Sequence, residues 1–200
     1  MMKLGRRTFT FALLITALGA AGWLVGNSRA ATETPKYESV KIDGKIEIRD
    51  YPELMVATAA MKANKDNSFM TLFRFITGAN EGQQKIEMTT PVLMASEKDK
   101  RTMSFIVPKA TVEKGIPKPT GESVTLGKIE ASRFVALRFA GRGSPETEAK
   151  AVEKLRAWMG EQKLAAKGDP VFAYYDPPWT PVFMRRNEVM LRIEKPAAKK

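Results

Sequence analysis

Carboxylates are the first residues of this chain that could do chemistry, because the chain contains no histidine and no cysteine. It therefore lacks a general base that titrates near neutral pH, a thiolate nucleophile and the usual metal ligands. Four glutamates stand on predicted strands: Glu47, Glu87, Glu130 and Glu188. Two carboxylates that face one cleft can do acid–base catalysis, but this spacing brings no two of them to one site. We expect no enzymatic activity, with a carboxylate-dependent hydrolase as the less favoured alternative.

An aromatic stripe is the second feature with chemical potential. Its apolar residues recur at i, i+3, i+4 and i+7, as on one face of a helix: Phe69, Leu72, Phe73 and Ile76. Arg74 lies at an adjacent helical angle. Such a stripe packs on a sheet by default, so we expect only its edge to contact a ligand.

A proline-stiffened loop carries the third feature. Trp179 follows the turn Asp176-Pro177-Pro178, and a large aromatic side chain on a loop is often an anchor or a pocket lid. The 11 methionines show no short repeat, so gap filling in the core is the favoured use.

The charge balance favours anionic partners. The chain carries a net charge of +11, of which four positive charges lie in residues 1–30, so the remainder carries +7. A solvated basic surface is the default explanation. No lysine or arginine block is long or aromatic enough to indicate nucleic-acid binding, and we expect none.

The first 30 residues have the pattern of an export segment. Lys3, Arg6 and Arg7 precede an uncharged, largely apolar run at 9–25, and small residues stand at −3 and −1 of a possible cut before Ala31. The run also approaches the length of a membrane anchor. The arginine pair resembles a twin-arginine signal, so both export routes stay open. We expect a domain in the periplasm or on the outer face of the inner membrane, which contacts the membrane only through this segment and only if the segment is not cleaved.

The remaining chain predicts a single α+β domain. We expect a linker at 31–36, the domain at 37–195 and a basic tail at 196–200. Helices are predicted at 68–77 and 145–162, and long strands at 45–60, 85–95 and 128–140. Lys-Ile-Glu opens the long strand of each half, so we predict a duplicated β-α-β-β unit that forms a twisted antiparallel sheet or open barrel with two helices. A monomer is expected.

Several motifs resemble one family in their order along the chain. They are Glu47-Ile48-Arg49-Asp50-Tyr51, then Gly78, Asn80, Lys85, Ile86, Met88, Thr89, Pro91 and Val92. They continue with Phe105-Ile106-Val107-Pro108, Ile116-Pro117-Lys118-Pro119, Tyr175-Asp176-Pro177-Pro178 and Arg186-Asn187-Glu188-Val189. Each motif is weak alone, but together they resemble the SOUL haem-binding proteins over about 160 residues.

The resemblance implies binding of haem or a related tetrapyrrole in a shallow apolar cleft, for carriage, buffering or sensing. Carried over to this chain, the cleft would use these residues: Phe69, Met70, Phe73, Arg74, Tyr175, Trp179, Met184 and Arg185. No histidine can hold the iron. The conceivable weak ligands are Met70, Met88, Met184, Tyr174 and Tyr175, and the propionate partners are Arg74, Arg185 and Arg186. The alternative is a module that binds another amphipathic ligand, such as a lipid or hydrophobic metabolite.

Overall fold

A computed structural model describes residues 32–62, 66–97 and 100–195. The predicted export segment (1–30) and basic tail (196–200) lie outside these residues. Within the described part, no helix is both long and apolar enough to cross a bilayer. Residues 33–195 belong to one compact unit.

That unit contains nine strands, three α-helices and a short 3-10 helix among the described residues. The strands are β1 (Glu38–Asp43), β2 (Ile46–Tyr51), β3 (Leu54–Ala60), β4 (Val92–Glu97), β5 (Lys100–Ile106), β6 (Thr125–Ile129), β7 (Ser132–Phe139), β8 (Ala166–Tyr174) and β9 (Asn187–Ile193). The helices are α2 (Ser68–Ile76), α3 (Lys109–Lys114), α4 (Pro145–Glu161) and the 3-10 helix η1 (Val182–Met184).

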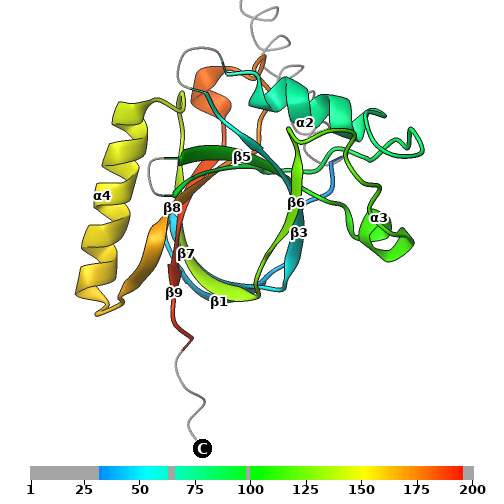
Figure 1. Cartoon of the computed structure of the whole chain (residues 1–200). Helices are drawn as coiled ribbons and strands as arrows, with labels where there is room; N and C mark the ends of the chain where they lie inside the picture. Colours follow the sequence, from blue (N-terminus) through cyan, green and yellow to red (C-terminus); the bar gives the residue numbers. More distant parts are fainter. Residues whose placement is uncertain (1–31, 63–65, 98–99, 196–200) are drawn as a thin grey trace, which may run out of the picture. The chain divides into compact units, whose positions relative to one another are not determined.

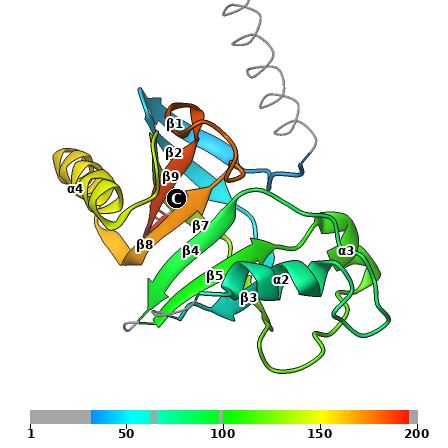
Figure 2. The same ribbon diagram turned by 90° about the horizontal axis from the view of Figure 1, so that it is seen from above.

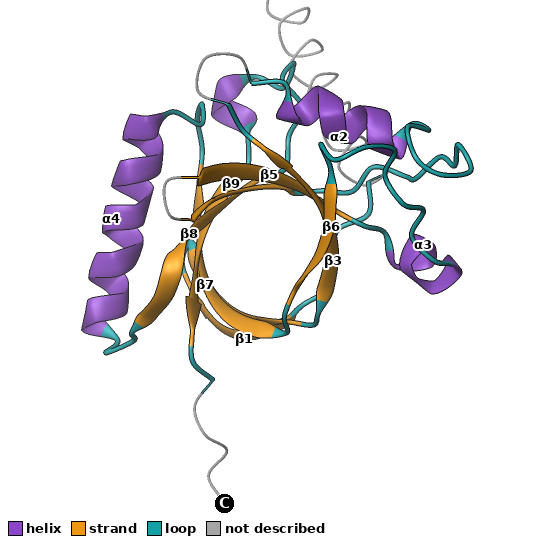
Figure 3. Ribbon diagram, viewed as in Figure 1, coloured by secondary structure: helices purple, strands orange, loops and turns teal. Residues whose placement is uncertain are grey.

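The strands form one antiparallel sheet in the order β1-β2-β7-β9-β8-β4-β5-β3-β6. The sheet curves into an open barrel, with α4 outside one wall and α2 and α3 outside the opposite wall (Figure 1). Strands and helices occupy separate layers (Figure 3). The predicted α+β class with a twisted antiparallel open barrel is confirmed. The short helix α3 was not predicted.

The strand order is symmetric about the β4·β8 pair. Reading outward, β4-β5-β3-β6 corresponds to β8-β9-β7-β2, and α2 and α4 occupy equivalent places in the two chain halves. A duplicated unit would produce this order, although duplication itself stays a prediction.

Local sequence determines one turn and one helix start. Asp43 pairs with Ile46 across a two-residue turn in which Gly44 has φ +58°, a backbone conformation that glycine adopts without steric cost. Helix α4 begins after Ser144, which forms a capping box with Thr147, and Pro145 fills its first turn.

Three long predicted strands are shorter or broken. The 45–60 strand divides at Pro52-Glu53, where the chain leaves the β2–β7 ladder and continues as β3 against β5 and β6. The 128–140 strand divides likewise, since β6 ends at Ile129 and β7 begins at Ser132. Residues 85–91 are not a strand, because Ile86 donates its N–H to the Ile76 carbonyl at 2.8 Å instead of joining a ladder.

Side chains alternate between the two faces of the sheet. Val135 and Leu191 face outward and pack beneath Leu155 of α4. Phe134 and Met190, one position away, belong to a different cluster and therefore point into the barrel. A third cluster lies under α2, on the side away from α4 (Figure 2). This inside–outside alternation determines which polar residues are enclosed.

Candidate functional site

Helix α2 presents an apolar face to solvent. Its buried residues are Ser68, Leu72, Phe75 and Ile76. Phe69, Met70 and Phe73 are instead 42%, 47% and 40% exposed. The predicted core stripe was therefore partly wrong, since Phe75 packs on the sheet where Phe69 and Phe73 were expected. Because both faces of α2 are apolar, periodicity alone did not determine its rotation.

The exposed rings form an ordered aromatic ridge. Phe69 and Phe73 lie with ring centroids 6.1 Å apart and planes inclined by 11°. Phe69 also contacts Phe105 of β5 edge-to-face, at 5.4 Å between centroids. This contact holds one ring of the ridge against the sheet, so a flat ligand meets a prearranged surface. Arg74 is exposed on the same helix.

Asn80 fixes the end of α2. It is 2% exposed, and its amide group donates to the Phe75 and Gln84 carbonyls at 2.7 and 2.8 Å. Its side-chain oxygen accepts from the Gln84 N–H at 2.9 Å. Asn80 therefore satisfies backbone groups of the loop, and it anchors the helix that carries the aromatic ridge.

The 176–186 loop forms a separate exposed apolar patch. Arg185 closes the loop by donating to the Thr180 carbonyl at 2.9 Å and to the Pro178 carbonyl. Trp179 and Phe183 remain 81% and 74% exposed. The loop and α2 lie on the same side of the barrel in Figure 1, but Figure 2 shows them displaced from one another along it.

The structure separates the remaining predicted site residues. Tyr175 is 6% exposed and donates its hydroxyl to Glu188 inside the barrel, so it is not part of the α2 surface. Arg185 is engaged by loop carbonyls. Met184 lines a cavity at one end of the barrel, to which α2 contributes no described residue. The predicted site residues therefore lie in three separate places: on α2, in the 176–186 loop and inside the barrel.

A buried ion-pair network occupies the barrel interior. Glu188 of β9 has no exposed surface, and Arg49 of β2 is 4% exposed. The guanidinium of Arg49 donates to the Glu188 carboxylate at 2.6 and 3.2 Å. Arg186 donates to it at 3.0 and 2.7 Å, and Tyr175 at 2.9 Å. Five hydrogen bonds exceed the roughly four lone-pair positions of a carboxylate, so Glu188 is saturated.

This network was missed from the sequence. The neighbouring Asn187 satisfies a backbone group, because its amide group donates to the Gly141 carbonyl at 2.9 Å. Glu188 instead binds side chains. The period-two spacing of Glu47, Arg49 and Tyr51 was the available signal, because it puts all three on one face of a strand.

The network opposes acid–base chemistry at neutral pH. Burial alone would raise the pKa of Glu188, but the hydrogen bonds and charges of Arg49 and Arg186 outweigh it, and the pKa lies below its ordinary value. Burial raises the pKa of Tyr175, and the neighbouring Glu188 charge adds to that rise. Among the described residues, no group of three or more acidic side chains could hold a metal ion.

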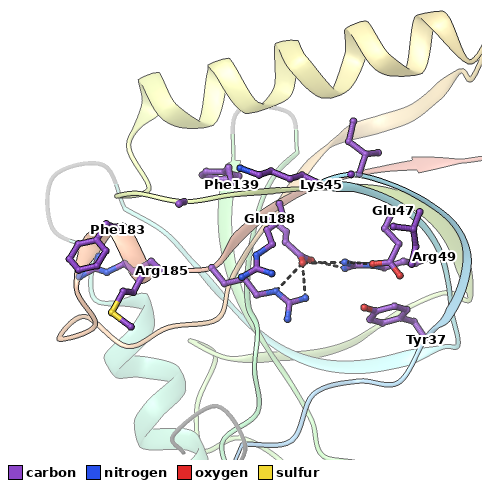
Figure 4. A pocket seen from close by; sticks show the side chains of 15 residues that line it. Tyr37, Lys45, Glu47, Arg49, Phe139, Phe183, Arg185 and Glu188 are labelled. Carbon is purple, nitrogen blue, oxygen red and sulfur yellow. Dashed lines mark hydrogen bonds and ion pairs between the residues drawn. The ribbon is translucent and has the colours of Figure 1, made fainter. Parts of the chain in front are cut away.

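A cavity of about 430 Å³ opens above this network. It is bounded by the β1–β2 turn, the end of β7 and the segment that leads into β9. Figure 4 shows Glu188 and Arg49 pointing toward one another, with Lys45 and Phe139 on one side and Phe183 and Arg185 at one end. A cavity of this size is typical of sites for small molecules.

Comparison with known families gives one match over most of the chain. The sequence model of the family described as SOUL heme-binding protein matches residues 32–192. The comparison with curated proteins gives no match.

Solved structures share the fold at low sequence identity. The C-terminal domain of EcmrR is 15% identical with a TM-score of 0.52, and the match covers 80% of this chain and 98% of that one. A hydrolase from Listeria innocua is 14% identical with a TM-score of 0.55, covering 78% and 94%. EcmrR in a DNA complex is 13% identical with a TM-score of 0.53, covering 93% and 70%. These likenesses concern the fold alone.

Proposed function

Because the chain belongs to the SOUL haem-binding protein family, we propose that it binds haem or a related tetrapyrrole on the exposed aromatic face of α2, without chemical turnover. The observation that carries this proposal is the stacked, solvent-exposed pair Phe69 and Phe73, with Met70 beside it. Contiguous apolar surface on a folded domain marks a binding site more often than chance exposure does. Carriage, buffering or sensing suits such a shallow surface.

The residues of α2 fit the parts of a tetrapyrrole. The rings of Phe69 and Phe73 offer an apolar face to the macrocycle, and Arg74 supplies an exposed guanidinium for a propionate. When bound, haem would supply an iron that a side chain of this face could ligate. Met70 is the candidate ligand on this face, because it is 47% exposed.

The two tyrosines are poor iron ligands in this fold. Tyr175 donates its hydroxyl to Glu188, and Tyr174 donates to Glu148 at 2.5 Å. Burial raises the pKa of both phenols, and the neighbouring carboxylates add to the rise. Tyrosine binds iron as the phenolate, which these surroundings disfavour. Iron coordination is therefore weak or absent.

Weak iron coordination limits the affinity. A macrocycle that buries about 300 Å² of apolar surface gains about 7 kcal/mol at roughly 25 cal/mol/Å². Association costs several kcal/mol for lost translational and rotational freedom. The expected dissociation constant is micromolar or weaker, which allows a carrier to release its ligand.

The carboxylate-dependent hydrolase is disfavoured by the surroundings of its candidate residues. Glu188 is saturated by five hydrogen bonds and has a lowered pKa. Glu47 pairs with Arg49 at 2.7 Å, and Glu87 is an exposed partner of Lys85. The lowered pKa of Glu188 keeps this carboxylate ionised near pH 7, so it does not act there as a general acid.

The place of action follows from the sequence of residues 1–30. A basic start, an apolar run and small residues near Ala31 support export to the periplasm or the outer face of the inner membrane. There a monomeric domain would meet tetrapyrrole outside the cytoplasm.

The test is a comparison of haem with metal-free porphyrin. The purified chain is titrated with ferric haem, read from the Soret band, and with protoporphyrin, read from its fluorescence. Binding of both, with affinities within about tenfold of each other, supports a site that holds the ring. Absence of any spectral change with either ligand would overturn the proposal. Equal binding of unrelated apolar probes would favour the alternative, a general site for amphipathic ligands.

A further inference from the structure

The cavity at the end of the barrel lies apart from the α2 face, since α2 contributes no described residue to its lining. We propose that this cavity is a second binding site and that it takes a small organic carboxylate with an apolar body. The proposal is independent of tetrapyrrole binding, because it rests on different residues, on their charges and on a half-open cavity of about 430 Å³.

The lining of the cavity carries an excess of positive charge. Its cations are Lys45, Arg49, Arg138, Arg185 and Arg186. Its acids are Glu47 and Glu188, and both already have arginine partners. Glu47 pairs with Arg49 at 2.7 Å, and Glu188 pairs with Arg49 at 2.6 Å and Arg186 at 2.7 Å. Two acids thus balance two arginines, and three positive charges remain for a ligand.

Two of the remaining cations are available to move toward a ligand. Lys45 and Arg138 are exposed, and no hydrogen bond or ion pair joins either side chain to the described part of the chain. The main chain holds them side by side, because the Arg138 N–H donates to the Lys45 carbonyl at 2.9 Å. A guanidinium binds a carboxylate through two parallel hydrogen bonds, and an ammonium adds a point charge.

Apolar side chains complete the recognition. Phe139 is half-buried in the lining, Phe183 is 74% exposed at its edge, and Ile42 of β1 is 69% exposed. These surfaces suit an aliphatic or aromatic body, with the carboxylate directed to Lys45 and Arg138. A cationic ligand is disfavoured because Glu188 has no acceptor position left.

The experiment compares ligands of one shape and opposite charge. The purified full chain is titrated with octanoate and with octylammonium by isothermal titration calorimetry, at low and at high salt. The test variant is Lys45→Gln/Arg138→Gln. The matched control is Lys154→Gln/Arg156→Gln, which removes the same charges from exposed positions of α4 that do not line the cavity.

The expected result is octanoate binding that weakens with salt, with no binding of octylammonium. Each substitution at the cavity should weaken octanoate binding about fivefold, as expected for unit charges about 4 Å apart in a solvent-like dielectric. The α4 control should bind as wild type does. The inference is overturned if octanoate does not bind, if octylammonium binds equally well, or if the two double variants behave alike.

A haem titration of the same variants separates this proposal from the tetrapyrrole proposal. Because Lys45 and Arg138 line a cavity to which α2 contributes no described residue, their substitution should leave haem binding unchanged. Loss of haem binding together with octanoate binding would show one shared site and would overturn the assignment of a second one.

Discussion

The buried carboxylate of Glu188 gives the sharpest stability prediction. Glu188→Gln keeps the size of the side chain but removes its charge and one of its two acceptor oxygens. Arg49, 4% exposed, would then keep only Glu47 as an acidic partner. The N–H₂ group of the new glutamine would also face the N–H donors of the guanidinium groups, from which the carboxylate now accepts hydrogen bonds.

The structure sets the size of the effect. At least two of the five hydrogen bonds to Glu188 are lost, and bonds to charged groups contribute about 1.5–3 kcal/mol each. Breaking a buried ion pair from one side costs about 3–5 kcal/mol in general. We therefore expect the free energy of unfolding to fall by about 3–5 kcal/mol, and the melting temperature of a domain this size by about 6–20 °C.

The assay is urea unfolding followed by far-ultraviolet circular dichroism at pH 7. The matched control is Glu130→Gln, which removes a carboxylate from an exposed pair with Lys128 and should leave the midpoint unchanged. If Glu188→Gln lowers the midpoint no more than Glu130→Gln does, the network does not stabilise the barrel and the reasoning is refuted.

The pH dependence supplies a second check on Glu188. Its pKa in the folded chain lies below the ordinary value of 4.5, so the folded state holds the carboxylate ionised where the unfolded state protonates it. The stabilisation is therefore complete above pH 4.5 and is lost as the pH falls through the folded-state pKa. The midpoint difference between wild type and Glu188→Gln should be constant from pH 8 to about 5 and should shrink at lower pH.

Three further predictions concern other parts of the fold. Gly143→Ala should destabilise the fold, because the new Cβ would lie 2.5 Å from the Tyr174 ring, and adding Tyr174→Leu should recover part of the loss in a thermal melt. Asn80→Ala should lower the free energy of unfolding by about 2–3 kcal/mol, because a buried side chain that bonds three backbone groups is lost; an unchanged urea midpoint would contradict this. Burial raises the pKa of Tyr51 to about 12, and it raises the pKa of Tyr174 and Tyr175 above the ordinary 10. The free energy of unfolding should therefore fall as the pH rises above 10. Three of the four tyrosines should resist titration, read from absorbance at 295 nm, until the chain unfolds.

Local signals predicted the parts of the fold that local physics determines. The predicted start of α4 at residue 145 is confirmed, because the cap made by Ser144 and Pro145 depends on neighbouring residues alone. The divisions of the two long predicted strands were missed because they depend on which strands each segment pairs with. The β2 and β3 segments join different ladders, and that choice is made by residues far along the chain.

The candidate site was predictable only in part, for the same reason. The residues of α2 were identified, but which of its apolar residues face solvent depends on how the helix rotates against β3 and β5. The Arg49–Glu188 pair joins residues 139 positions apart, so no window of sequence contains it. The family resemblance assigned Tyr175 to the apolar cleft, whereas its hydroxyl donates to the buried Glu188 inside the barrel.

Haem binding by the α2 ridge is tested most directly by Phe69→Ala/Phe73→Ala, with Val40→Ala/Val112→Ala as a control of similar exposure on β1 and α3. The exposed parts of the two rings contribute about 2 kcal/mol together, or about 30-fold in Kd. A Soret titration should show that loss in the α2 variant, with wild-type binding in the control and a native circular dichroism spectrum in both. Equal haem affinity in the two variants would contradict the assignment of the site to α2.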